Sequence, residues 1–163
     1  MDNLQKATFA AGCFWGVQHY FDQVPGVIET VAGYIGGHKE NPSYEEVCSH
    51  TTGHAEAVEL KFDPELVSYE ALVKHFFRIH DPTQLNRQGP DIGDNYRSAI
   101  FFHDLDQKKV AESVRDEVQK QYSDPVVTDI SMSISFYPAE DYHQKFTEKT
   151  GHGMCPIDYR PII

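Results

Sequence analysis

The 163-residue chain contains no apolar run that approaches the roughly 20 residues of a membrane-spanning helix. Basic residues are few: 14 Lys and Arg stand against 25 Asp and Glu, and the formal net charge is −11. Nonspecific binding of nucleic acids or anionic membranes needs basic patches, so we expect neither partner. The first residues lack the basic-then-apolar order of a signal peptide, and we therefore expect a cytoplasmic protein.

Cysteine is scarce as well, with Cys13, Cys48 and Cys155 separated by long intervals. An odd count argues against a disulfide framework, and the lack of a closely spaced pair argues against a structural zinc site. The nine histidines lack the helix context and third ligand of a catalytic metal site, so we expect no metal and no other cofactor. At least one cysteine is therefore a candidate functional thiol.

What the chain does have is enough apolar material for one domain with a real core, since 40% of its residues are hydrophobic and 12% are aromatic. No repeat, low-complexity tract or interior linker divides residues 1–163, which we interpret as a single domain. Apolar periodicity predicts strands at 4–11, 27–35, 57–62, 98–102 and 130–136, and helices at 13–24, 72–79 and 111–122. The strands at 27–35 and 57–62 have only a short helical turn between them. A βαββαβ-type α+β sandwich with long loops therefore fits better than a doubly wound sheet, and we expect an extended, mobile tail after residue 150.

The most informative segment is 12–16, where the sequence GCFWG places Cys13 between glycines and beside two aromatics. The helical pattern that follows puts Cys13 in the first turn of a helix. Unpaired backbone N–H groups and the helix dipole favour a thiolate there, and a thiolate is a nucleophile. A cysteine simply buried in an aromatic core remains an open alternative.

Glu56 is the second candidate. Period-two alternation places it on the same strand face as Val58, Leu60 and Phe62. Desolvation on an apolar face raises the pKa of a carboxyl group, which makes Glu56 a candidate proton donor near neutral pH. The alternative is that the strand begins after Glu56 and leaves it in a solvated turn.

Five further residues carry weaker signals or none. Tyr44 and Tyr96 lie in polar loops, where their hydroxyls either donate to an oxygen or pack at the surface. Asp91 lies in a loop bounded by glycines, as turn-forming aspartates do. Cys155 lies in the Gly-rich tail and is either a resolving thiol or incidental. Cys48 has no activating neighbour in sequence, and we interpret it as incidental.

Six blocks of this sequence together resemble the peptide-methionine (S)-S-oxide reductases, the A-type methionine sulfoxide reductases. The blocks lie at 12–16, 44–48, 52–56, 80–84, 91–98 and 139–144, in the family's order and over nearly the whole chain. The resemblance implies a two-layer α/β plait with a ferredoxin-like core. It also implies reduction of methionine-S-sulfoxide, free or in proteins.

The resemblance implies a role for each matching residue. Cys13 would attack the sulfoxide sulfur and become a sulfenic acid. Phe14 and Trp15 would hold the ε-methyl group of the substrate. Glu56 would donate a proton to the sulfoxide oxygen.

The remaining roles concern binding and recycling. Tyr44 and Tyr96 would hydrogen-bond the sulfoxide oxygen, and Asp91 would help to position the substrate or the hydrogen bonds of the site. Cys155 would then form a disulfide with Cys13, which thioredoxin would reduce. We expect the protein to act as a monomer.

Two rival functions stay open. A cysteine hydrolase would use Cys13 with His19 or His54 as its base, and would need no reductant. A redox-sensing or methionine-binding module would oxidise Cys13 without turnover.

Overall fold

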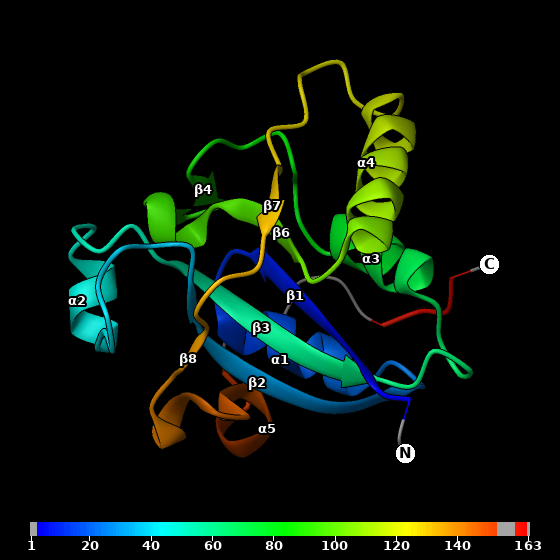
Figure 1. Cartoon of the computed structure of the whole chain (residues 1–163). Coiled ribbons are helices and arrows are strands. Elements are labelled where there is room, and N and C mark those ends of the chain that lie inside the picture. Colours follow the sequence, from blue (N-terminus) through cyan, green and yellow to red (C-terminus); the bar gives the residue numbers. More distant parts are fainter. Residues whose placement is uncertain (1–2, 153–158, 163) are drawn as a thin grey trace.

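The computed structural model describes residues 3–152 and 159–162. Its centre is a six-stranded sheet in the order β7-β6-β1-β3-β2-β8 (Figure 1). The strands are β1 (Gln5–Ala11), β2 (Val27–Ile35), β3 (Ala55–Phe62), β6 (Ser98–Phe102), β7 (Asp129–Met132) and β8 (Tyr137–Pro138). Neighbouring strands are antiparallel, except for β6 and β7, which run parallel. The fold is thus mixed α/β with a mostly antiparallel sheet.

The α-helices of the described residues are α1 (Phe14–Asp22), α2 (Tyr44–Cys48), α3 (Tyr69–Arg78), α4 (Leu105–Gln119) and α5 (Phe146–Thr150). Two 3-10 turns, η1 (Asp94–Tyr96) and η2 (Asp141–His143), and a hairpin of β4 (Arg87–Gln88) and β5 (Asp91–Ile92) complete the elements. Side-chain caps define helix starts: Ser68 accepts from the Ala71 N–H at α3, and Asp104 accepts from the Gln107 N–H at α4. No helix among the described residues is long and apolar enough to cross a bilayer.

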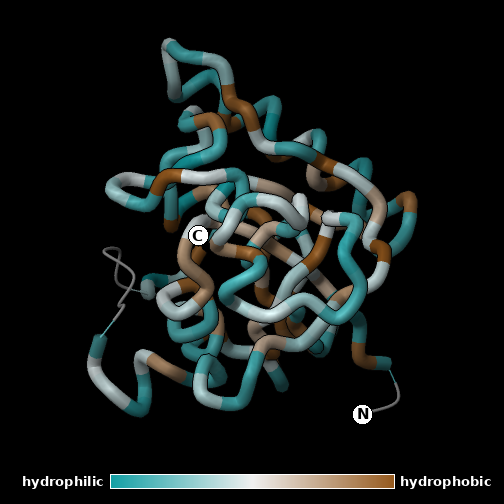
Figure 2. Tube along the Cα trace, turned by 90° about the vertical axis from the view of Figure 1, so that its left-hand side faces the viewer, coloured by the Kyte–Doolittle hydropathy of each residue, from teal (hydrophilic) through white to brown (hydrophobic). Residues whose placement is uncertain are grey.

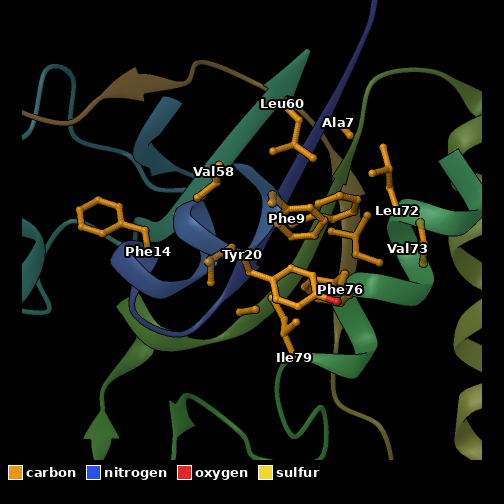
Figure 3. Packing of buried hydrophobic residues seen from close by; sticks show 14 of the residues in the cluster. Ala7, Phe9, Phe14, Tyr20, Val58, Leu60, Leu72, Val73, Phe76 and Ile79 are labelled. Carbon is orange, nitrogen blue, oxygen red and sulfur yellow. The ribbon is translucent and has the colours of Figure 1, made fainter. Parts of the chain in front are cut away.

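Helices α1, α3 and α4 contribute to one core with the sheet, and aromatic rings fill much of it. Phe9 of β1 stacks on Phe21 of α1 and on Phe76 of α3, with ring centroids 5.4 and 5.3 Å apart (Figure 3). In the same view Phe14 lies apart from these rings, on the far side of Val58. The hydrophobic parts of the trace lie mainly toward the middle of the molecule (Figure 2). This core fixes the start of α1 beside β3.

The sequence pattern predicts one strand over 130–136, and this prediction is wrong in its second half. β7 ends at Met132 on one edge of the sheet, and pairing resumes at Tyr137 as β8 on the opposite edge. Between them the chain crosses the sheet face that α1, α3 and α4 leave free (Figure 1). Phe136 packs against that face, whereas Ile134 is exposed. The alternation therefore marks neither a continuous strand nor a buried face, since Met132 is exposed as well.

The expected mobile tail is docked where the structure describes it. Tyr159 stacks on His75 of α3 with ring centroids 5.5 Å apart. The Arg78 guanidinium, also from α3, donates to the carbonyl oxygen of Arg160. The candidate resolving residue Cys155 lies outside the described residues.

Candidate active site

Cys13 stands at the N-cap of α1, so the helix begins one residue after it. Gly12 has a φ of 92°, and a Cβ at this position would lie 3.0 Å from the Gln88 Cβ, so a glycine is needed here. The backbone N–H groups of Trp15 and Gly16 hydrogen-bond the Cys13 sulfur and favour its thiolate form. The local sequence therefore supplies the helix-start environment that the pattern predicts.

The expectation that this environment yields a ready thiolate is wrong. Burial and the negative charge of Glu56 raise the pKa of Cys13 to about 12, and the charge of Asp91 adds to the rise. The two backbone hydrogen bonds oppose this effect without cancelling it. Cys13 is therefore a thiol at neutral pH, and its proton must leave during any reaction in which the sulfur attacks.

Glu56 is the second residue of β3 and is only 1% exposed. The strand begins before it, which excludes the alternative of a solvated turn. Its Oε1 accepts a hydrogen bond from the Phe14 backbone N–H, and its Oε2 accepts one from the Asn95 side-chain amide, both at 3.3 Å. The Phe14 bond ties β3 directly to the start of α1, and so brings Glu56 next to Cys13.

Burial raises the pKa of Glu56 to about 8, although the hydrogen bonds from Phe14 and Asn95 lower it. The negative charge of Asp91 contributes to the rise. At neutral pH the site therefore pairs a protonated carboxyl group with a thiol. Ionisation of Glu56 further opposes loss of the Cys13 proton.

Phe14 and Trp15 occupy different environments. Phe14 is fully buried, with its ring centroid 5.3 Å from that of His143 and 6.4 Å from that of Tyr44. Trp15 is partly exposed and stacks on Phe146 with ring centroids 3.9 Å apart. Its indole N–H donates to His143 Nδ1 at 2.9 Å. Phe14 and Trp15 thus both pack against His143, Phe14 from the core and Trp15 from the surface.

Tyr44, the first residue of α2, and Tyr96, the last of η1, both hydrogen-bond the Cys48 sulfur through their hydroxyls. Burial raises the pKa of both tyrosines, and the charge of Glu56 adds to the rise. Both hydroxyls therefore keep their protons and are donors within the field of Glu56. Cys48 lies beside both tyrosines, and burial raises the pKa of its thiol, so its interpretation as incidental stays a prediction.

Asp91 opens β5, and its negative charge raises the pKa of both Cys13 and Glu56. The β4–β5 hairpin that carries Asp91 is hydrogen-bonded to the backbone of Asp81. The Asp81 backbone N–H donates to Gln88 Oε1, and Gln88 Nε2 donates to the Asp81 carbonyl, both at 2.9 Å. The structure thus brings together every described residue that the sequence nominates for the site.

Four further residues of this region have no role predicted from the sequence: Tyr34, Asn95, Glu140 and His143. Tyr34 pairs directly with Glu56 in the β2–β3 register, and its hydroxyl donates to Glu140 Oε1 at 2.8 Å. Glu140 Oε2 accepts the Tyr44 backbone N–H at 3.0 Å. The predicted strand at 27–35 includes Tyr34 but does not identify its partners. The contacts of Glu140 join distant parts of the chain and leave no local pattern.

The hydrolase alternative requires an imidazole beside Cys13. His54 is instead buried, where Nδ1 accepts the Gly37 backbone N–H at 3.0 Å and Nε2 donates to the Lys39 carbonyl at 2.7 Å. His19 lies in the last turn of α1, whereas Cys13 precedes the first. Neither imidazole is placed to take the Cys13 proton.

Two other features lie outside this arrangement. A cavity of about 450 Å³ opens between α3 and α4, and Phe77, Val118 and Tyr122 are among its lining residues. None of the residues nominated for chemistry lines it. Among residues 3–152 and 159–162, no three His, Cys, Asp or Glu side chains are grouped to hold a metal ion.

Residues 5–163 match the family model described as peptide methionine sulfoxide reductase. The chain is 56% identical over 155 residues to peptide methionine sulfoxide reductase MsrA of Geobacter sulfurreducens, a match that covers 94% of this chain and 96% of that protein. Mxr1 from Saccharomyces cerevisiae in reduced form superposes with a TM-score of 0.90 at 34% identity, over 98% of this chain and 93% of Mxr1. Mxr1 in complex with Trx2 superposes with a TM-score of 0.64 at 26% identity, over 98% and 91% of the two chains.

Proposed function

The chain belongs to the peptide methionine sulfoxide reductase family, and from this premise we propose that it reduces methionine-S-sulfoxide, free or in proteins, to methionine. The pairing of Cys13 with Glu56 carries the proposal. A sulfoxide oxygen is a poor leaving group until it is protonated. The pKa of Glu56 is about 8, so Glu56 keeps its proton at neutral pH. It lies beside the Cys13 thiol, and an acid and a nucleophile are therefore both present.

The proposed reaction balances with these two groups. Glu56 donates its proton to the sulfoxide oxygen while the Cys13 sulfur attacks the sulfoxide sulfur. The proton of the Cys13 thiol passes to the Glu56 carboxylate and restores the acid. The hydroxyl group then moves from the substrate sulfur to the Cys13 sulfur: the substrate S–O bond and the new bond between the two sulfurs break, an oxygen bond to the Cys13 sulfur forms, and methionine leaves a Cys13 sulfenic acid. Cys13 is thereby oxidised by two electrons and the substrate sulfur is reduced by two.

The surrounding side chains fit the three groups on the sulfoxide sulfur. We assign the ε-methyl group to Phe14 and Trp15, which line an aromatic wall. Tyr44 and Tyr96, whose hydroxyls stay protonated, are assigned to the sulfoxide oxygen. Asp91 positions the hydrogen bonds of the site. If methyl, oxygen and lone pair each have a fixed place, one epimer fits, and the family resemblance makes it the S epimer.

Recycling is assigned to Cys155, which condenses with the Cys13 sulfenic acid to give a disulfide and water. Thioredoxin then reduces the disulfide, and the complex of the yeast relative with Trx2 supports this assignment. Cys155→Ser should keep dithiothreitol-supported turnover and lose thioredoxin-supported turnover. Equal turnover with thioredoxin would contradict the pairing and direct attention to Cys48.

The finer description of the fold is part of the same proposal. The strand order β6-β1-β3-β2, with α1 and α3 as the connecting helices, supports a ferredoxin-like βαββαβ core within the larger sheet. A monomeric state and a cytoplasmic location stay predictions from the sequence.

The function is tested by giving the reduced protein each separated epimer of a blocked methionine sulfoxide with dithiothreitol. We expect methionine from the S epimer and none above background from the R epimer. Turnover of neither epimer would contradict the function, and equal turnover of both would contradict the three-point fit.

A further inference from the structure

Asn95 is a residue of the site to which the proposed chemistry gives no role. It lies in the middle of η1, beside Tyr96, and its side chain is completely buried. Its Nδ2 donates to Glu56 Oε2 at 3.3 Å. Its Oδ1 is buried too, and no described residue donates a hydrogen bond to it. A buried acceptor without a donor costs free energy and requires a physical explanation.

The backbone next to Asn95 is shaped to admit its amide. Gly93 has a φ of 144°, and a Cβ at this position would lie 2.6 Å from Asn95 Oδ1 and 2.3 Å from the His50 ring. A larger residue at 93 would therefore displace the amide from Glu56. Within this close packing, the main freedom left to the Asn95 side chain is rotation of its carboxamide plane.

A carboxamide offers opposite chemistry at its two ends. The NH₂ end donates hydrogen bonds and suits a carboxylate, whereas the oxygen accepts them and suits the hydroxyl of a carboxylic acid. The present orientation directs Nδ2 at Glu56 and therefore matches an ionised Glu56. A half-turn of the amide would direct Oδ1 at the hydroxyl of the acid and give the buried acceptor its donor.

We propose that Asn95 is a positioning residue for Glu56 whose carboxamide turns over as Glu56 gives up its proton, an inference that rests on the function proposed above. In the resting site Oδ1 holds the hydroxyl of the acid. When the proton moves to the sulfoxide oxygen, Nδ2 donates to the carboxylate that remains and stabilises its charge. Return of a proton from the Cys13 thiol to Glu56 reverses the turn.

Titratable or charged groups face Glu56 from several elements: Cys13 before α1, Tyr34 of β2, Tyr44 and Cys48 of α2, Asp91 of β5 and Tyr96 of η1. Of the groups that act on Glu56 itself, Asp91 raises its pKa, whereas the Phe14 N–H and the Asn95 amide lower it. Because a hydrogen bond to the charged carboxylate is stronger than one to the uncharged acid, loss of the Asn95 amide should move the ionisation of Glu56 to higher pH. Loosened packing at residue 95 would give no such directed change.

The test is Asn95→Leu, which keeps the approximate size and removes the hydrogen bonds. The rate of a single turnover of the S epimer is measured from pH 6 to pH 10. We expect a fall of about 10- to 100-fold at pH 7, because the carboxylate formed in the transition state loses a donor. The fall in rate at high pH should begin roughly one pH unit later than in the wild type. Asn95→Gln, which keeps the carboxamide, should restore part of both effects.

The matched control is Gln107→Leu, which removes a buried amide remote from Glu56 that bonds the His103 N–H and the Lys6 carbonyl. It should lower stability and leave the pH profile unchanged. An active wild type with an unshifted Asn95→Leu profile overturns this inference alone. A wild type that does not reduce the S epimer overturns the proposed function and this inference together.

A second measurement uses the wild-type protein and therefore does not depend on whether Asn95→Leu folds. The side-chain ¹⁵N resonance of Asn95 and the carboxyl ¹³C resonance of Glu56 are followed from pH 6 to pH 10 in the wild type. The two should titrate with one midpoint, while the side-chain amide of Gln107 stays constant. An Asn95 amide that does not respond to Glu56 ionisation overturns the inference.

Discussion

Cys13 and Glu56 form the floor of the site and come from the start of α1 and from β3, whereas Tyr44, Asp91 and Tyr96 form its rim and come from short connecting segments. The floor rests on the core, since β3 is central in the sheet and α1 packs against it. The burial that places the floor also raises the pKa of both of its groups. Position and reactivity of the floor therefore have one cause.

The rim is held by individual hydrogen bonds instead. Helix α2 has five residues and begins with a capping box in which Ser43 accepts the Glu46 N–H and Glu46 accepts the Ser43 N–H. Glu140 accepts the Tyr44 N–H. A few polar contacts therefore suffice to orient the hydroxyl groups of the rim, whereas the thiol and the carboxyl group of the floor keep their protons because they are buried.

Two carboxyl groups make the same point. Both are desolvated, which favours the uncharged form. In Glu140, hydrogen bonds from the Tyr44 N–H and the Tyr34 hydroxyl outweigh this effect and lower the pKa. In Glu56, burial prevails and the pKa rises to about 8. Glu140 is thus a carboxylate that holds the rim residue Tyr44, and Glu56 is a carboxyl group of the floor that keeps its proton at neutral pH.

The largest effect is expected from Cys13→Ser. Methionine formation from the S epimer should fall by at least roughly four orders of magnitude with any reductant, because a hydroxyl does not replace the reducing thiol. A rapid-quench assay of methionine measures it, and an unchanged thermal midpoint shows that the variant is folded. Appreciable residual turnover would contradict the assignment of Cys13 as the nucleophile.

Glu56→Gln should lower the rate by about 10²- to 10³-fold at pH 7, because the amide has no acidic proton to give. The wild-type rate should fall as pH rises through about 8, where Glu56 ionises, and this dependence should vanish in the variant. Glu59→Gln is the matched control, since Glu59 lies on the same strand within 3.7 Å of Lys6. The idea fails if the variant keeps the wild-type pH profile.

Tyr44→Phe and Tyr96→Phe test the rim. Each should lower the rate by roughly tenfold, because one neutral donor to the sulfoxide oxygen is lost while the other remains. The double variant should lose about a hundredfold, and Tyr122→Phe, beyond α4, should match the wild type in the same assay. A loss at either tyrosine larger than that of Glu56→Gln would break the distinction between floor and rim.

The smallest effect concerns stability. Folding raises the pKa of Glu56 from an ordinary value of 4.5 to about 8. The folded state therefore retains a proton that the unfolded state releases, and its stability declines as pH rises from about 5 to 8. Glu56→Gln lacks this decline, so its melting temperature should gain about 10 °C relative to the wild type over that interval. If the melting temperatures of the wild type and Glu56→Gln changed in parallel with pH, burial of Glu56 would not set its pKa.

The sequence predicts the floor better than the rim because periodicity is a local property. The alternation at 57–62 places Glu56, and the helical pattern after Cys13 places the thiol. For Tyr44 and Tyr96 the polar loops left surface packing open, and only the family resemblance gave them a role, since their contacts with Cys48 depend on tertiary structure.

The failures have the same origin. The helix start at Cys13 is local, but the burial and the Glu56 charge that raise its pKa come from distant elements. The alternation at 130–136 is real, yet it cannot reveal that the chain leaves one sheet edge and joins the other. The hydrogen bond of Trp15 to His143 crosses most of the chain and has no signature in sequence spacing.

The most direct test of the floor is one turnover without reductant in Cys155→Ser. The protein is mixed with excess S epimer, methionine is quantified, and intact-protein and peptide mass spectrometry locate added oxygen. We expect one methionine per protein and one oxygen atom on Cys13. Methionine formed without oxidation of Cys13, or oxygen found on Cys48 instead, would contradict it.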